Sequence, residues 1–473
     1  MKLVTLEGAE TFIDDPLISG FKDSVQCEVL SQGESGYNES RVIYNGMFDI
    51  KPALIVRTIT VDDVVKTVNF ARDNNILLAV KGGGHSVAGK CLSPGGITID
   101  LRLMNGVYVD PEARIARVGG GTLLGEMDKA TQAYGLAAPS GIVSDTGVAG
   151  LTLGCGFGWL RGKYGFSIDN LLSVNIVTAD GQFRHASASE NEDLFWAVRG
   201  GSGNFGVVTT FEFRLHPVGP ELMFSGPMYP AENAKTIITK WREFMMGAPD
   251  EFSSMVIMMT VPELDTFPKE IQGRDAIMLG GVHCGSVEEG EKFIKPLREF
   301  GELLFDLSGP KKYTEIQSMF DSPLPQGSLI CYFTSLYLET FNDEVVDTLI
   351  ESFGKRPAKL VPFVVQDLRG ASMRVRSQKT AFGERSAPYL LEINSAWLDP
   401  KDSESNIAWT RENMDKFKSF SSGRTYLNHS GLNEEGEALV KRTYGSNYER
   451  LRQIKKKYDP GNLFRLNQNI PPA

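Results

Sequence analysis

Three glycine-rich segments within the first 210 residues place the strongest constraint on the fold; they cover residues 82–84, 147–158 and 200–206. Where side chains are absent, successive backbone N–H groups can turn toward one anion, and the backbone can lie flat against a planar ring. Each segment alone is more often an ordinary turn than a binding site. We therefore interpret the three segments together.

The first segment stands in the sequence Lys-Gly-Gly-Gly-His-Ser at residues 81–86, between apolar runs at 76–80 and 96–101. The runs predict strands, and the glycines predict a loop between them. A histidine at the end of a phosphate-holding loop brings a nucleophilic imidazole close to the molecule that carries the phosphates. The position of His85 therefore indicates a tethered cofactor.

The third segment contains a formal match to the G-x-G-x-x-G dinucleotide fingerprint at residues 201–206. That fingerprint must follow a strand and begin a helix, whereas here a helix-like stretch at 193–198 precedes it and a strand-like stretch at 207–213 follows. An NAD site of this type is therefore disfavoured. The three segments with His85 instead favour an extended cofactor with a pyrophosphate and a flat ring, which describes FAD.

Charge and cysteine usage exclude several classes of function. Lys plus Arg number 49 against 59 Asp plus Glu, a net charge of −10, which argues against nucleic acid or an anionic membrane as partner. No stretch approaches the roughly 18 apolar residues of a membrane span, and the first residues lack a signal-peptide pattern. The five cysteines are scattered and never spaced Cys-x-x-Cys, which disfavours disulfides and a metal site. We expect a cytoplasmic protein that binds no metal.

The pattern of strands and helices changes at Pro217. Before it, short strands alternate with glycine clusters, a helix begins after the N-cap residue Thr60, and Asp180-Gly181 closes a hairpin. After it we expect longer strands at 224–229, 253–261, 276–284, 329–338, 360–366 and 390–397, with helices at 231–246 and 287–300. At about 100 to 200 residues per domain, the chain should form two or three units.

Four separate motifs resemble those of the berberine-bridge-enzyme-like flavin oxidases, within the vanillyl-alcohol-oxidase and PCMH-type FAD-binding superfamily. The matching segments are residues 81–89, 147–170, 193–217 and 444–470. The resemblance implies an α+β fold: a PCMH-type FAD-binding domain of two subdomains and an antiparallel-sheet substrate domain flanked by helices. We expect the FAD-binding domain at 1–217, completed by the C-terminal segment 436–473, and the substrate domain at 218–435.

The resemblance also implies which residues hold FAD. His85 would be bonded covalently to the methyl carbon of the benzenoid ring of the flavin. Many relatives carry a second tether, a cysteine, where this chain has Val143, and Cys155 is interpreted as a small buried packing residue, so we expect a single covalent link. The implied cofactor-binding residues are Lys81, Gly82, Gly83, Gly84, His85, Ser86, Gly89, Gly147, Gly150, Gly154, Gly156, Gly203, Gly206, Val208, Asn467 and Asn469.

The catalytic base is expected to come from the substrate domain, because a flavin accepts hydride while the protein removes a proton. Relatives often place a tyrosine where this chain has His429, and an imidazole changes charge near neutral pH. His429 could equally be a polar pocket residue. Glu392, Tyr332 and Tyr444 are further candidates, each as easily explained by a solvated strand face or by aromatic packing.

The favoured function is an FAD-linked oxidase that acts on an alcohol, a sugar or a secondary metabolite and passes electrons to O2, producing hydrogen peroxide. Its partners would be the small-molecule substrate and O2, with no nucleic acid and no membrane. Two alternatives stay open: a flavin dehydrogenase with another electron acceptor, and a flavoprotein without catalytic activity.

Overall fold

The computed structural model describes all residues from 1 to 473. The first glycine loop follows the edge strand of a four-stranded sheet. Its strand order is β3 (Glu28–Ser31), β4 (Leu54–Arg57), β6 (Ile97–Asp100) and β5 (Leu78–Lys81), with β4, β6 and β5 parallel. The expected helix is α3 (Val61–Asp73), and the Thr60 hydroxyl accepts from the Asp63 N–H in a capping box. Also in this region are α1 (Asp15–Ser24), α2 (Tyr37–Ser40) and the hairpin of β1 (Lys2–Val4) and β2 (Glu10–Phe12).

A second sheet of five antiparallel strands follows, in the order β11 (Phe183–Ser187), β10 (Leu171–Val177), β12 (Val207–Arg214), β8 (Ile115–Gly119) and β7 (Val107–Asp110). The expected Asp-Gly turn joins β10 to β11, with Gly181 at φ +74°. Four helices accompany this sheet: α4 (Leu124–Gln132), α5 (Val148–Gly154), α6 (Arg161–Tyr164) and α7 (Glu192–Val198). A short pair, β9 (Leu136–Ala137) with β13 (His216–Pro217), leads into the third sheet.

The third sheet is antiparallel throughout, as the family resemblance implies. Its main order is β18 (Phe305–Asp306), β15 (Pro227–Pro230), β17 (Asp275–His283), β16 (Phe252–Thr260), β21 (Phe363–Asp367), β22 (Tyr389–Trp397) and β20 (Ile330–Leu338), and β14 (Glu221–Ser225) and β19 (Gly309–Lys312) extend it beside β17. The single strand expected at 224–229 is two strands, because the chain leaves the ladder at Gly226, whose N–H donates to the Ser308 hydroxyl.

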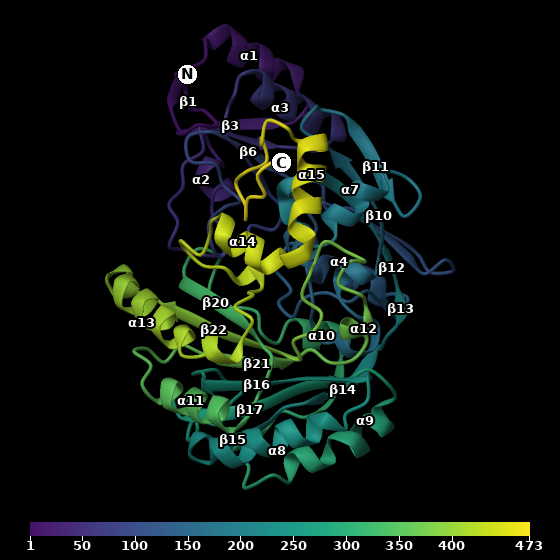
Figure 1. Cartoon of the computed structure of the whole chain (residues 1–473), viewed down its shortest axis with the longest axis vertical. Helices are drawn as coiled ribbons and strands as arrows, with labels where there is room; N and C mark the ends of the chain where they lie inside the picture. Colours follow the sequence, from purple (N-terminus) through teal and green to yellow (C-terminus); the bar gives the residue numbers. More distant parts are fainter.

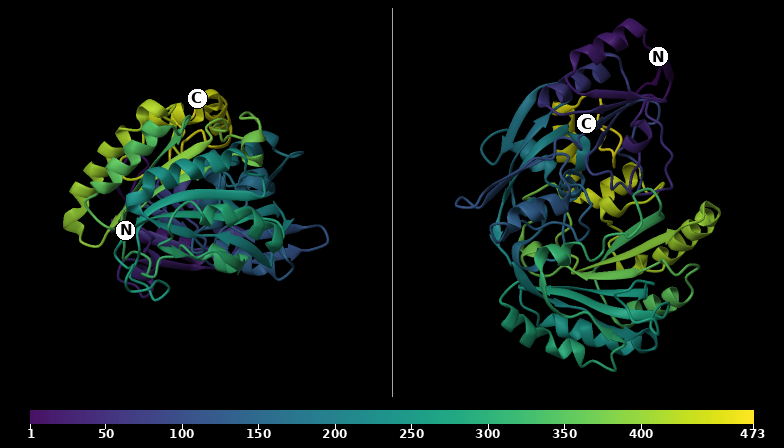
Figure 2. Two further views of the ribbon diagram at one scale, coloured as in Figure 1. Left: turned by 90° about the horizontal axis from the view of Figure 1, so that it is seen from below. Right: turned by 180° about the vertical axis from the view of Figure 1, so that it is seen from behind.

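Helices cover the outer face of this third sheet (Figures 1 and 2): α8 (Ala234–Met246), α9 (Val287–Ile294), α11 (Asp343–Gly354) and α13 (Ser403–Asp415). The helix expected at 287–300 continues after α9 only as a tight turn at Lys295–Arg298 that contains Pro296. Side chains alternate along β22, so that Leu391 and Ile393 join the helix-covered core while Glu392 and Asn394 point to the opposite face. That opposite face is turned toward the first two sheets.

The C-terminal segment returns to the second sheet, where α15 runs beside α7 (Figure 1). It contains α14 (Glu437–Tyr444) and α15 (Tyr448–Tyr458). A fully buried ion pair lies at the C-terminal end of α15, where Lys455 Nζ is 2.6 Å from Asp459 Oδ2. Asp459 also accepts from the N–H groups of Leu463 and Phe464. These bonds fix the start of the tail that carries Asn467 and Asn469.

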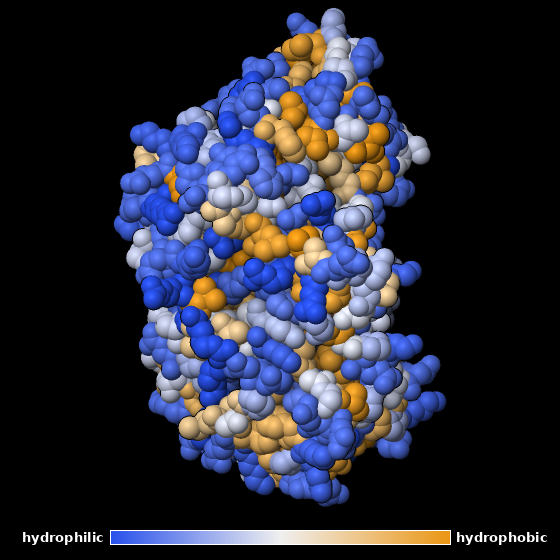
Figure 3. All heavy atoms as spheres, turned by 90° about the vertical axis from the view of Figure 1, so that its right-hand side faces the viewer, coloured by the Kyte–Doolittle hydropathy of each residue, from blue (hydrophilic) through white to orange (hydrophobic).

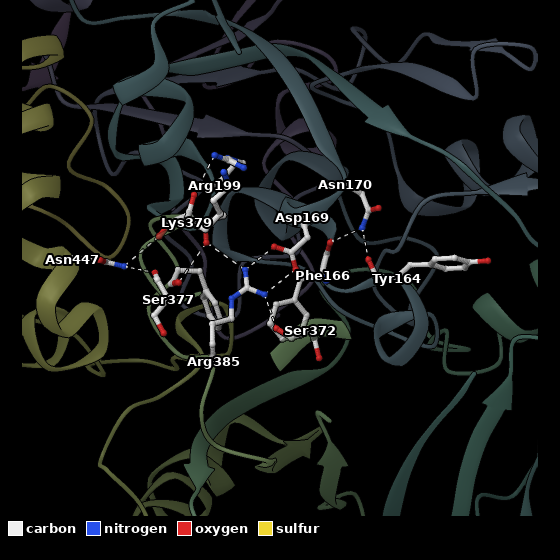
Figure 4. Close-up of polar contacts among 12 residues, drawn as sticks. Tyr164, Phe166, Asp169, Asn170, Arg199, Ser372, Ser377, Lys379, Arg385 and Asn447 are labelled. Carbon is white, nitrogen blue, oxygen red and sulfur yellow. Dashed lines mark hydrogen bonds and ion pairs between the residues drawn. The ribbon is translucent and has the colours of Figure 1, made fainter. Parts of the chain in front are cut away.

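A buried arginine links the third sheet to the second (Figure 4). Arg385 precedes β22, in the same connection as α12 (Ala371–Arg374), and its two terminal nitrogens donate to both oxygens of Asp169 at 2.8 and 2.7 Å. On the C-terminal side, Asn447 Nδ2 donates to the carbonyl of Ser377 at 3.0 Å. The connection between β21 and β22 therefore holds all three parts of the chain together.

Hydrophilic side chains cover most of the face in Figure 3, and hydrophobic ones form patches in its upper part and across its middle. No helix has the length and apolar character that a membrane span requires.

Candidate cofactor and active site

A close backbone approach explains the glycines of the first loop. This loop follows β5 and runs against the start of α5. A Cβ on Gly83 would lie 2.4 Å from the nitrogen of Gly147, and a Cβ on Gly147 would lie 2.3 Å from the nitrogen of Gly83. Gly84 has φ +75°, a conformation that favours glycine. The loop and the start of α5 thus form one continuous backbone surface.

Sequence reasoning missed a further glycine segment, Gly119–Gly121, which belongs to the same surface. A Cβ on Gly120 would lie 2.4 Å from the carbonyl oxygen of Val208, and a Cβ on Gly82 would lie 3.2 Å from the carbonyl oxygen of Gly120. The adjacent Thr122 hydroxyl is buried without a hydrogen-bond partner. The signal was available, because three consecutive glycines stand at the end of a strand here, much as three follow a strand at 82–84.

The C-terminal tail brings polar atoms to the third predicted glycine segment. Asn204 Nδ2 donates to the carbonyl of Gln468 at 3.1 Å, which fixes the tail beside Gly203. The Oδ1 atoms of Asn467 and Asn469 are buried and have no hydrogen-bond partner. Buried polar atoms are normally paired. These orphaned acceptors, beside backbone that lacks side chains, therefore fit a large polar cofactor such as FAD.

Several predicted cofactor residues also have contacts within the protein. Lys81 is buried, and its Nζ donates to the carbonyl of Ser40 at 2.6 Å and lies 3.5 Å from Asp100 Oδ2. Four glycines are packed so closely that a Cβ would meet a neighbour: Phe48 at Gly89, Asn428 at Gly154, Ser167 at Gly156 and Val177 at Gly206. Ser86 Oγ accepts a hydrogen bond from the N–H of Lys90. Gly150 differs, because a Cβ there would meet nothing within 4 Å.

The imidazole of His85 is held between two side chains. The ring of Tyr44 stacks on it, with the centroids 3.9 Å apart and the planes 22° apart. Asp145 Oδ1 lies 3.3 Å from His85 Nε2. The contact with His85 is the largest cause that holds the pKa of the Asp145 carboxyl below its ordinary value. Sequence reasoning did not single out Tyr44 or Asp145, because neither stands near His85 along the chain.

Glu392 and His429, both predicted as candidate bases, lie together on the inner face of the third sheet. His429 Nδ1 is 3.2 Å from Glu392 Oε1, and only 3 % of the Glu392 side chain is exposed. Gln366 on the neighbouring strand β21 donates through Nε2 to the same oxygen at 3.0 Å. The Asn394 Oδ1 atom beside them is buried and unpaired. A buried carboxylate beside an imidazole is an arrangement that can accept and stabilise a proton.

Arg161 places a buried positive charge near this pair. Its guanidinium donates to the carbonyls of Asp367, Gly158 and Ser254 at 2.8, 2.8 and 2.6 Å. Burial lowers the pKa of Arg161 to about 10, while the negative charges of Asp367 and Glu392 act in the opposite direction. The arginine thus offsets part of the cost of burying Glu392.

The structure does not bring the two predicted tyrosines to His429. Tyr332 belongs to the helix-covered face of β20, where its hydroxyl accepts from Arg411 Nε at 2.9 Å and donates to Glu434 Oε1 at 2.8 Å. Tyr444 is buried in α14, and its hydroxyl donates to the carbonyl of Gly200 at 3.1 Å. Neither contact involves the Glu392 and His429 pair.

Cys155 is buried, as its interpretation as a packing residue predicts, and lies in an apolar cluster with Phe157, Phe166 and Tyr337. Burial raises the pKa of its thiol well above the ordinary value. A thiol in these surroundings is not a reactive nucleophile.

Two family profiles match separate parts of the chain. Residues 52–187 match the FAD binding domain, and residues 425–471 match the family described as berberine and berberine like. The first match contains His85 and the first two glycine segments, and the second contains His429 and the tail. The two matches therefore fall on the parts that the fold brings together.

Full-length relatives agree with these matches. The chain is 30% identical to (R)-6-hydroxynicotine oxidase of Paenarthrobacter nicotinovorans, covering 95% of this chain and 97% of that protein. It is also 30% identical to the uncharacterized FAD-linked oxidoreductase YvdP of Bacillus subtilis, covering 94% and 98%.

Solved structures share the whole fold. 6-Hydroxy-D-nicotine oxidase from Arthrobacter nicotinovorans superposes with a TM-score of 0.85 at 28% identity, covering 98% of this chain and 100% of that one. BBE-like 1 of Physcomitrella patens superposes with a TM-score of 0.86 at 22% identity, covering 97% and 99%. By its sequence, its fold and the fit of its glycine surface to FAD, this chain belongs to the berberine-bridge-enzyme-like family of FAD-linked oxidoreductases.

Proposed function

We propose that the protein is an FAD-linked oxidase that removes hydride from a carbon bearing a hydroxyl or amino group in a small-molecule alcohol, sugar or secondary metabolite, and that it holds FAD through one covalent bond to His85. The observation that carries this proposal is the pairing of the buried Glu392 carboxylate with His429 on the sheet face turned toward the FAD-binding residues. FAD supplies the hydride acceptor when it is bound.

The glycine surface and the tail would hold the two ends of the cofactor. The backbone of residues 82–84, with the Thr122 hydroxyl, offers donors for a pyrophosphate. The unpaired Asn467 and Asn469 side chains offer polar contacts for a ring. Stacking by Tyr44 and the contact with Asp145 fix the His85 imidazole in one orientation, so that a single tether suffices.

The proton of the substrate hydroxyl or amine would pass to His429. Because Nδ1 of His429 faces Glu392, the free Nε2 is the atom that accepts this proton. Glu392 stabilises the resulting imidazolium, and Gln366 holds the carboxylate in place. A proton-accepting group positioned in this way contributes roughly 10²- to 10⁴-fold to a rate.

The experiment is flavin reduction under anaerobic conditions with a panel of amines, alcohols and sugars. The flavin of the wild type should bleach with one class of substrate. In Glu392→Gln and His429→Ala, flavin reduction should be at least about 100-fold slower. Tyr332→Phe, on the opposite face of the sheet, is the matched control and should reduce at the wild-type rate. Equal rates in all four proteins would contradict the assigned pair.

The electron acceptor is tested by admitting air to the reduced enzyme. Two structures of the same fold carry different names, a chitooligosaccharide oxidase and the glucose dehydrogenase Phl p 4. The fold alone therefore does not set the acceptor. The proposal expects rapid return of the oxidised spectrum with one hydrogen peroxide per substrate. A spectrum that stays bleached would favour a dehydrogenase, and failure of every substrate to bleach it would favour a flavoprotein without catalytic activity.

The proposal also places the enzyme in the cytoplasm, since its five cysteines are all free thiols. Cell fractionation with an antibody against the native chain tests this placement, and recovery of the protein outside the cytoplasmic fraction would contradict it.

A further inference from the structure

His85 and Asp145 contact each other, and no other side chain competes for the two atoms that meet. His85 Nε2 and Asp145 Oδ1 are both buried, and what joins them is an ion-pair distance, since neither atom forms a hydrogen bond of good geometry with any group. The other carboxylate oxygen, Oδ2, accepts only a long bond of 3.5 Å from Gln326 Nε2. The two groups therefore have chiefly each other as partners, 3.3 Å apart, although 60 residues separate them in the chain.

A carboxylate beside one imidazole nitrogen decides which nitrogen carries the proton. An ionised Asp145 only accepts hydrogen bonds, so it favours the form of His85 with hydrogen on Nε2. In that neutral form the lone pair lies on Nδ1, which takes part in no hydrogen bond within the protein. Tyr44 stacks on the ring and restricts its rotation. His85 is thus held with Nδ1 as its nucleophilic atom.

The loop that carries Asp145 is itself fixed. Ser144 donates to Asp321 through its N–H at 2.7 Å and through its hydroxyl at 2.5 Å. Gly147, two residues beyond Asp145, lies against Gly83 of the histidine loop. The carboxylate and the imidazole therefore sit on two backbone segments that cannot easily move apart.

We propose that Asp145 is a positioning residue for covalent flavin attachment: it holds the Nε2 proton of His85 and directs Nδ1 to the methyl carbon of the flavin. This inference rests on the proposed covalent link through His85 and names the atom that forms it.

The attachment reaction balances with dioxygen as the oxidant. One C–N bond forms between His85 Nδ1 and the methyl carbon. The methyl group loses one proton, and the imidazole loses its single N–H proton, which Asp145 can accept from Nε2. The two electrons left from the broken C–H bond pass through the flavin to dioxygen, and with the two protons they yield hydrogen peroxide.

The test measures the rate of attachment in the full-length protein. Wild type, Asp145→Asn, Asp145→Glu and Asp321→Asn are each incubated with FAD in air and sampled over time. Acid precipitation and intact mass give the covalent flavin, and gel filtration before acid treatment gives the total bound FAD. Asp321→Asn is the matched control, because it removes a carboxylate that does not face His85, while the amide can still accept from the Ser144 N–H and donate to the Ser144 hydroxyl, so that the loop stays fixed.

We expect Asp145→Asn to bind FAD but to form the covalent bond at least about tenfold more slowly than the wild type. Asp145→Glu should restore part of the rate, and Asp321→Asn should attach FAD at the wild-type rate. If Asp145→Asn does not retain FAD, Asp145→Ser replaces it under the same criteria.

Two results overturn the inference and are distinguishable. A wild type that attaches FAD while Asp145→Asn does so at the same rate removes the role of Asp145 and leaves the link through His85 intact. A wild type that binds FAD without acid-stable attachment removes the covalent link, and the role of Asp145 with it.

Discussion

At the scale of single residues, two side chains that are distant in sequence, Tyr44 and Asp145, hold the imidazole of His85. His85 and the flanking glycines could be identified from their order along the chain. Asp145 and Tyr44 could not, because only folding brings them to His85. Tyr332 illustrates a second limit. Neighbouring residues of a strand point to opposite faces, so one position decides between the flavin side and the helix side.

Gly150 provides a prediction at the scale of one residue. Replacing it should raise the stability of the FAD-free protein but lower its binding of FAD. Gly150 lies in α5 with open space where a Cβ would stand. Gly150→Ala should stabilise the FAD-free protein by about 0.5 to 1 kcal/mol. The same methyl group would enter the cofactor space and should lower FAD content, measured as the ratio of flavin to protein absorbance.

Gly20 in α1 is the matched control for Gly150, because a Cβ there also meets nothing within 4 Å. Gly20→Ala should give a similar gain in stability without a change in FAD content. If Gly150→Ala bound as much FAD as Gly20→Ala, Gly150 would not line the cofactor site.

At the scale of elements, alternation and capping signals predicted most strands and helices. The pattern of Leu391 and Ile393 against Glu392 and Asn394 predicted β22, and Thr60 predicted the start of α3. The short α10 (Tyr313–Gln317) was not predicted. It has little apolar periodicity of its own and is held by contacts with α4, so its sequence carries only a weak local signal.

The packing of α10 against α4 predicts a pH dependence of stability. Gln317 Nε2 donates to Asp128 Oδ2 at 3.0 Å, but Asp128 Oδ1 has no partner. Burial raises the pKa of Asp128 to about 7. The folded protein therefore holds this proton more tightly than the unfolded chain, so the stabilisation is complete below about pH 4 and is lost as the pH rises to about 7.

Asp128→Asn should remove this pH dependence while its Oδ1 retains an acceptor for Gln317. At pH 8 the free energy of unfolding should rise by on the order of 4 kcal/mol, and near pH 4 it should change little. Urea unfolding at both pH values measures the effect. An unchanged difference between the two pH values would show that Asp128 is not the titrating group.

At the scale of the whole molecule, three parts distant in sequence meet around Arg385 (Figure 4). The ion pair with Asp169 is almost fully buried, with exposed fractions of 2 % and 9 % for the two side chains. The family resemblance implied the antiparallel sheet of the substrate domain, but nothing in the sequence indicated this contact. A lone arginine in a loop carries no pattern that reveals a partner 216 residues away.

Arg385→Met should destabilise the protein by about 3 to 5 kcal/mol, because it leaves the Asp169 carboxylate buried without its partner. The double variant Asp169→Asn/Arg385→Met should recover part of this loss, since no buried charge remains unpaired. Thermal unfolding of the wild type, the single variant and the double variant measures both effects. A single variant as stable as the wild type would mean that the contact does not hold the parts together.

The mass of the denatured protein tests the account most directly. The wild type should be heavier than its polypeptide by one FAD less two hydrogen atoms, and His85→Ala should have the mass of the polypeptide alone while still binding FAD before denaturation. A wild type with the bare polypeptide mass, or a His85→Ala protein that still carries the flavin mass, would contradict attachment through His85.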